Sequence, residues 1–275
     1  MPLAFLFSDI AKGLFLCLFV TLWPTFITNE RYMNILIIGA TSGIGKALFE
    51  KYIIEGNRLG IVGRRAYLLD EFYQQHPDNT FTSAADITRQ EEIEQAIHTL
   101  CAKLEHIDLA IVCSGTGDLN PSLDYALECP AIDTNVRGWT FVIDTLYHIL
   151  EQQSYGHLVA VTSVGGLRGE PMAPAYSATK AYQINYMEAL RKKAFKSGGH
   201  ITVTDIRPGL VDTAMAKGDG LFWVMPVDKV ADQIISAIRK KKLKHTSPNV
   251  GTSSPSSIRI YHSPCIDYCS IIRIR

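Results

Sequence analysis

A glycine cluster between an apolar run and a helical period constrains the fold most strongly. Residues 34–38 are apolar apart from the first, and they lead into Gly39-Ala40-Thr41-Ser42-Gly43-Ile44-Gly45, after which helical spacing continues to residue 55. This order predicts a strand, a tight turn and a helix. Glycines in such a turn let the backbone approach a pyrophosphate, whose charge is met by amide groups at the helix start. The pattern indicates a dinucleotide site, although a plain tight turn fits it too.

The same rhythm of strand and helix continues along the chain. We expect further strands over residues 58–62, 81–86, 109–113, 157–162 and 201–206, and helices over residues 66–75, 90–103, 131–151, 176–196 and 227–242. Apolar strands that alternate with helices predict an α/β fold, a single doubly wound parallel sheet of the Rossmann type with helices on both faces. No linker or internal repeat interrupts it, so we assign one domain to residues 33–244.

Both ends of the chain differ from this domain. Residues 13–27 carry no charge, yet these fifteen residues fall short of the ~20 that a membrane-spanning helix needs. Two interpretations of residues 1–32 stay open, a membrane anchor and an extension upstream of a natural start at Met33. Residues 245–275 hold seven serines and three prolines without a helical period, which predicts a disordered tail.

Charge and cysteine content exclude several classes of function. The chain has 27 basic and 27 acidic residues, so no overall field favours nucleic acid. Its six cysteines form no C-x-x-C pair with a matching pair of histidines, and we expect neither a metal site nor a disulfide framework. A reducing cytoplasmic location fits this usage, with membrane association through residues 13–27 as the open alternative.

Two arginines follow the second predicted strand. An acidic side chain here would bond both ribose hydroxyls and favour NAD(H). Arg64 and Arg65 stand here instead, and guanidinium groups form charge-assisted bonds with a phosphate. The sequence therefore favours NADP(H) over NAD(H), unless the two arginines are only solvated loop charges.

Tyr176 and Lys180 are candidate catalytic residues. Four residues apart, they share one face of a predicted helix, and Ser163 lies thirteen positions before the tyrosine. A neighbouring ammonium is expected to lower the pKa of the tyrosine from about 10, which would make its hydroxyl a usable proton donor and acceptor. By itself the spacing is weak evidence, because a solvated helix face produces it as well.

These motifs occur in the order typical of one family. From about residue 34 to residue 242 the chain resembles a short-chain dehydrogenase/reductase of the classical type. The resemblance assigns catalysis to Asn135, Ser163, Tyr176 and Lys180. It implies that the cofactor site consists of Gly39, Thr41, Ser42, Gly43, Ile44, Gly45, Arg64, Arg65, Asp86, Ile87, Ser114, Gly115, Tyr176, Lys180, Pro208, Gly209, Val211 and Thr213. Two departures stand out, since Cys113-Ser114-Gly115 replaces Asn-Ala-Gly and Ile38 replaces a threonine.

The resemblance also implies a mechanism. Hydride transfer from the nicotinamide to a carbonyl is coupled to proton delivery by Tyr176, while Ser163 bonds the substrate oxygen and Asn135 holds a water. Lys180 would bind the nicotinamide ribose. An apolar lid at residues 221–225 suggests an apolar small-molecule carbonyl or alcohol substrate, and the family commonly forms homodimers or homotetramers. The alternative is a non-catalytic module that senses NADP(H) or acts as a scaffold.

Overall fold

Seven parallel strands form one sheet in the computed structural model, which describes residues 32–215 and 224–247. The order across the sheet is β3-β2-β1-β4-β5-β6-β7. The strands are β1 (Asn34–Ile38), β2 (Arg58–Gly63), β3 (Thr80–Ala84), β4 (Leu109–Val112), β5 (Gly156–Val161), β6 (Ile201–Pro208) and β7 (Lys244–Ser247). The direction of winding reverses between β1 and β4, and doubly wound folds bind their ligands at the carboxyl ends of strands beside such a point.

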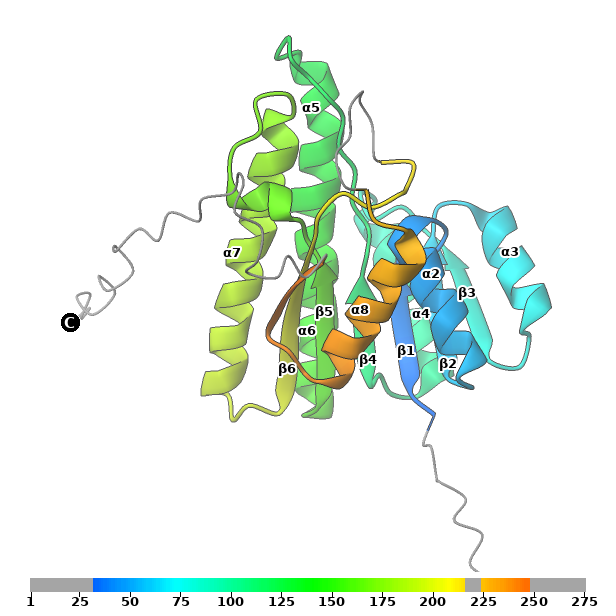
Figure 1. Ribbon diagram of the computed structural model, residues 1–275. Helices are drawn as coiled ribbons and strands as arrows, with labels where there is room; N and C mark the ends of the chain where they lie inside the picture. The colour runs from blue at the N-terminus through cyan, green and yellow to red at the C-terminus, as the bar shows by residue number, and fades with distance from the viewer. Residues whose placement is uncertain (1–31, 216–223, 248–275) are drawn as a thin grey trace, which may run out of the picture.

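Helices cover both faces of the sheet (Figure 1). One core packs β-sheet side chains against α4 (Gln90–Leu104), α6 (Trp139–Gln153) and α7 (Pro174–Lys196). The other packs the opposite face against α2 (Gly43–Ile54), α3 (Ala66–Gln75) and α8 (Val227–Arg239). Alternate residues of β1 divide between the two cores, because successive side chains of a strand point to opposite faces. The predicted doubly wound α/β fold is confirmed.

The edge strand β7 corrects one predicted boundary. Residues 244–247 pair in parallel with β6, from Asp205 opposite Lys244 to Pro208 opposite Ser247. His245 is buried at this edge. The prediction that residues 245–275 form a disordered tail is therefore wrong for residues 245–247, and residues 248–275 lie outside the described residues. The last predicted helix also ends early, at Arg239, because Lys241 takes a positive φ of 47°.

A π-helical turn divides the long helical region ahead of β5. Instead of one helix over residues 131–151, the chain forms α5 (Tyr125–Ile132), the π-helical turn η1 (Asp133–Gly138) and α6. Trp139 N–H donates to the carbonyls of Thr134 and Val136 and so skips the carbonyl of Asn135. A turn of this kind frees a main-chain carbonyl inside a continuous helical region.

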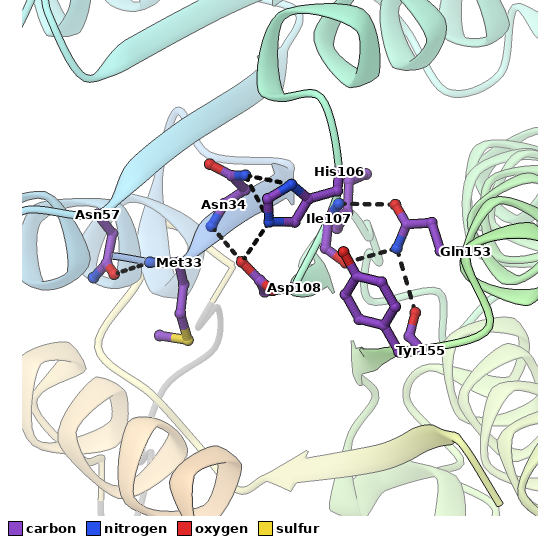
Figure 2. Close-up of polar contacts among 8 residues, drawn as sticks. All are labelled: Met33, Asn34, Asn57, His106, Ile107, Asp108, Gln153 and Tyr155. Atoms are coloured by element: carbon purple, nitrogen blue, oxygen red, sulfur yellow. Dashed lines mark hydrogen bonds and ion pairs between the residues drawn. The ribbon is translucent and has the colours of Figure 1, made fainter. Parts of the chain in front are cut away.

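Polar side chains close the amino-terminal edge of the sheet (Figure 2). The backbone N–H of Asn34 donates to the carboxylate of Asp108 at 2.9 Å, and the side chain of Asn34 contacts the ring of His106. Gln153 bonds both backbone groups of Ile107, accepting from its N–H at 2.9 Å and donating to its carbonyl at 3.0 Å. These bonds tie β1 and β4 to the end of α6.

The N-terminal segment, interpreted as an anchor or an upstream extension, and the predicted lid lie largely outside the residues that the structure describes. Residues 1–31 and 216–223 are not described, so the interpretations of residues 13–27 and of most of the lid are untested. In residues 32–215 and 224–247, no helix has the length and apolar character needed to cross a membrane. At the end of the lid, Met225 forms a parallel bridge with Val211.

Candidate active site

The glycine turn lies between β1 and the amino terminus of α2, and its backbone packs too closely to leave room for side chains at its glycines. Gly39 has a φ of 92° and Gly43 a φ of 53°, conformations that favour glycine. A Cβ added to Gly45 would lie 2.1 Å from the carbonyl oxygen of Gly39. Ser42 caps α2 without a side-chain hydrogen bond, and the first turn of α2 carries no acidic residue. The helix start therefore offers amide groups and a favourable dipole to an anion.

The arginines lie at the end of β2 beside this turn. Arg65 donates from Nη2 to the hydroxyl of Thr41 at 2.8 Å. Arg64 is 74% exposed, and its Nη1 lies 3.6 Å from a carboxylate oxygen of Asp86. Asp86 follows β3, and Ile87 is buried beside it. These predicted contacts for the adenosine part of a nucleotide therefore share one edge of the sheet with the glycine turn.

Three loops after β4, β5 and β6 contribute the rest of the site. Ser114 packs on the glycine turn, since a Cβ on Gly39 would lie 2.7 Å from its hydroxyl. Although Cys113 replaces asparagine, its N–H donates to the carbonyl of Ile38 at 2.8 Å and keeps β4 joined to β1. Thr213, beyond Pro208 and Gly209, lies 3.3 Å from the position of a Cβ on Gly43.

Ser163, Tyr176 and Lys180 come together at the carboxyl end of β5. Ser163 follows β5, and its hydroxyl accepts a hydrogen bond from Gly165 N–H at 3.0 Å. Tyr176 and Lys180 lie one turn apart in α7, with Lys180 Nζ 5.8 Å from the centre of the tyrosine ring. A Cβ on Gly165 would lie 3.3 Å from the Ser163 hydroxyl oxygen and 3.4 Å from Tyr176 Cε1. The serine and the tyrosine thus share one wall.

The pKa of Tyr176 moves in the direction opposite to the prediction. Burial raises the pKa of Tyr176 above 10, and a hydrogen bond from Ser163 offsets only part of that effect. Lys180 does not contribute the expected lowering. Its Nζ bonds to Gln183 Oε1 at 3.0 Å and to the carbonyl of Val161 at 3.4 Å. The predicted depression of the tyrosine pKa is therefore wrong for this structure, and the phenol stays protonated at neutral pH.

Lys180 is the second perturbed group of the site. Burial lowers the pKa of its ammonium to about 8, while Cys113 and Asp205 act in the opposite direction. Asp205 is fully buried and is held by the Thr162 hydroxyl at 2.6 Å and by Arg207 at 2.6 Å. Asp205 was not predicted from the sequence, since no motif distinguishes a buried aspartate within a strand such as β6.

The side chain of Asn135 has a structural task. Its Oδ1 accepts from Thr116 N–H at 2.8 Å, and its Nδ2 donates to the carbonyl of Thr116 at 2.6 Å and to the hydroxyl of Thr179 at 3.0 Å. The main-chain carbonyl of Asn135 accepts from Gln183 Nε2 at 2.9 Å. Both parts of the residue predicted to hold a water are thus bonded to protein groups. Gln183 was also missed, although it lies three residues after Lys180 on the same helix face.

Comparisons with known proteins identify the family and the fold. A family model described as short chain dehydrogenase matches residues 33–220. An uncharacterized oxidoreductase of Staphylococcus epidermidis is 30% identical over 224 residues, which cover 80% of this chain and 96% of that protein. The closed form of a serine dehydrogenase complexed with NADP+ aligns with a TM-score of 0.73 and 23% identity, over 82% of this chain and 98% of the other. A short-chain dehydrogenase from Sphingobium yanoikuyae in complex with NADPH gives a TM-score of 0.69 at 22% identity, over 79% and 89% of the two chains.

Proposed function

The chain belongs to the short-chain dehydrogenase family, and on that premise we propose that it is an NADP(H)-dependent oxidoreductase that interconverts a carbonyl and an alcohol, with Tyr176 as general acid and base. The observation that carries the proposal is the meeting of Ser163, Tyr176 and Lys180 in one site beside the glycine turn. A module that only senses a nucleotide needs the turn but has no use for a buried serine and lysine beside a half-buried tyrosine.

The residues of the glycine turn fit a dinucleotide. A Cβ on Gly39, Gly43 or Gly45 would crowd neighbouring protein atoms, so these glycines let the turn pack closely, and the amide groups at the start of α2 would meet the pyrophosphate. Arg64 and Arg65 would bind a ribose 2′-phosphate, which supports a preference for NADP(H) over NAD(H). The nicotinamide of the bound cofactor would supply the hydride.

A protonated Tyr176 phenol is the form that carbonyl reduction needs. A phenol that stays protonated at neutral pH can donate its proton to the substrate oxygen as negative charge develops there. Ser163 would donate a hydrogen bond to the same oxygen and stabilise that charge. Lys180, buried next to the tyrosine, would bind the nicotinamide ribose through its ammonium.

The loops around the site suggest an apolar substrate. Leu119, Met172, Leu210 and Met215 are each more than 40% exposed, and they come from the loops after β4, β5 and β6 at the carboxyl edge. Such side chains would contact the apolar part of an aldehyde or ketone. We propose that the protein works in the cytoplasm, where NADPH is available, as a homodimer or homotetramer.

Tyr176→Phe tests the mechanism. The substitution removes the proton donor and keeps the ring, so we expect turnover to fall by about 10²-fold to 10⁴-fold. The assay is the decrease in NADPH absorbance with a panel of aldehydes, ketones and quinones of increasing apolar length, and NADPH affinity is measured by calorimetry. Tyr73→Phe, a change at an exposed tyrosine of α3, is the control. Equal turnover by wild type and Tyr176→Phe would contradict the proposal.

A further inference from the structure

Gln183 lies between two parts of the site and contacts both. Its side chain is fully buried in α7, one turn after Lys180. Oε1 accepts from Lys180 Nζ at 3.0 Å, and Nε2 donates to the main-chain carbonyl of Asn135 at 2.9 Å. The amide oxygen thus accepts from a charged group, and the amide nitrogen donates to a carbonyl. Each end of the side chain therefore has a partner of the matching kind.

The π-helical turn explains why this carbonyl is available. In η1 the N–H of Trp139 bonds to Thr134 and Val136, so the carbonyl of Asn135 receives no bond from the residue four positions later. A buried carbonyl without a hydrogen-bond donor is unfavourable. Gln183 supplies that donor, and it also gives the buried ammonium of Lys180 a shorter bond than the one to Val161 at 3.4 Å.

We propose that Gln183 is a positioning residue for Lys180, with its side-chain amide joining the lysine to the carbonyl of Asn135 and fixing where the lysine points. This proposal rests on the proposed function, because it deepens the role of the same site. The Gln183 amide donates to the carbonyl of Asn135, the residue at which the family resemblance implies a bound water. An amide keeps its protons, whereas a water exchanges them, so the bridge orients the lysine and does not conduct a proton.

The lysine meets few other charged groups. Asp205 of β6 and Cys113 after β4 act on it from the sheet, and Tyr176 faces it from its own helix. Asp205 is already bound to Arg207 and Thr162, and burial keeps the Cys113 thiol protonated by raising its pKa to about 12. Gln183 is therefore the neutral acceptor whose removal changes Lys180 with least disturbance of these groups.

The experiment measures the protonation of Lys180 directly. In protein labelled with ¹³C-lysine, the Cε signal that disappears in Lys180→Arg is followed by NMR from pH 6 to 11, without cofactor or substrate. Gln183→Met keeps the approximate volume but removes the acceptor, so we expect the titration to move down by about one pH unit from its wild-type position. Gln183→Glu keeps an acceptor and adds a negative charge, so the midpoint of the Lys180 titration should move up by about one pH unit. Asn185→Met, an exposed change on α7, should move it by less than ~0.2 units.

A second readout separates orientation from general stability. The alkaline limb of the pH profile of kcat for NADPH-dependent reduction should shift in the same direction as the Lys180 titration in each variant. A Gln183→Met protein that melts like wild type and leaves both measurements unchanged would overturn the proposal, as would a Gln183→Glu protein with an unshifted titration. A wild-type protein that reduces no carbonyl would instead contradict the proposed function, and the NMR titration would still decide the role of Gln183.

Discussion

The two edges of the sheet use polar residues in opposite ways. At the amino edge the polar groups bond to one another and to strand ends, as Asn34 does with Asp108 and His106, and Gln153 with Ile107 (Figure 2). At the carboxyl edge Ser42 caps α2 without a side-chain bond, and Arg64 extends largely into solvent. The comparison teaches that polar groups whose hydrogen-bond partners lie within the protein contribute to stability, whereas polar groups without such partners are suited to bind a ligand.

Glycines with a positive φ occur at both edges. The positive φ angles of Gly39 and Gly43 lie in the turn that leads into α2, where they shape the predicted phosphate site. Gly56 also has a positive φ, of 80°, but lies after the end of α2 at the amino edge, with open space where a Cβ would go. Glycines therefore lie at both ends of α2, but Gly45, in its first turn, is packed too closely for a side chain, whereas Gly56 is not.

The largest expected effect separates these two glycines. Gly45→Ala places a methyl group 2.1 Å from the carbonyl oxygen of Gly39, so the turn must move, and we expect NADPH affinity to fall at least about 100-fold. Gly56→Ala meets no atom and should cost about 1 kcal/mol of stability through its φ alone, with affinity unchanged. Calorimetric titration with NADPH and thermal melting measure both. Affinity within about threefold of wild type for Gly45→Ala would break the comparison.

The next effect belongs to the amino edge. Gln153→Met removes two bonds to the backbone of Ile107 while keeping a similar volume, so we expect the free energy of unfolding to fall by about 2 kcal/mol without any change in NADPH affinity or kcat. Gln152→Met, at the exposed neighbouring position, should stay within about 0.5 kcal/mol. Urea unfolding gives the stabilities. If Gln153→Met altered kcat at unchanged stability, the amino edge would not be purely structural.

The fold followed from the sequence because its signals are local. Apolar strands, helical periods and the glycine turn are each patterns of neighbouring residues, and their alternation implies a parallel sheet. The strand β7 was missed because Lys244–Ser247 carries no apolar run, and its pairing depends on the exposed edge of β6. A short polar strand is therefore decided by tertiary contact.

The site was predictable in its residue types but not in its electrostatics. Spacing on a helix brought Tyr176 and Lys180 together as expected, yet the sign of the tyrosine pKa shift depends on burial, which no spacing reveals. The bond from Gln183 to Asn135 depends on a π-helical turn, and sequence patterns do not signal a single turn of that kind.

The smallest expected effect is on nucleotide affinity, and it contrasts the arginines at the two ends of β2. Arg64 follows the carboxyl end of β2 and is 74% exposed beside Asp86, where a phosphate can reach it, whereas Arg58, at the amino end, donates to the carbonyl of Lys103 at 2.9 Å and lies over the ring of Phe81. Because an exposed charge-assisted bond contributes modestly, Arg64→Ala should weaken NADPH about tenfold and NADH less than twofold. Arg58→Ala should change neither affinity, and competition titrations with both nucleotides provide the measurement. An equal loss for NADPH and NADH in Arg64→Ala would assign this arginine to a part of the nucleotide that both share, and the preference for NADP(H) would then lose its basis.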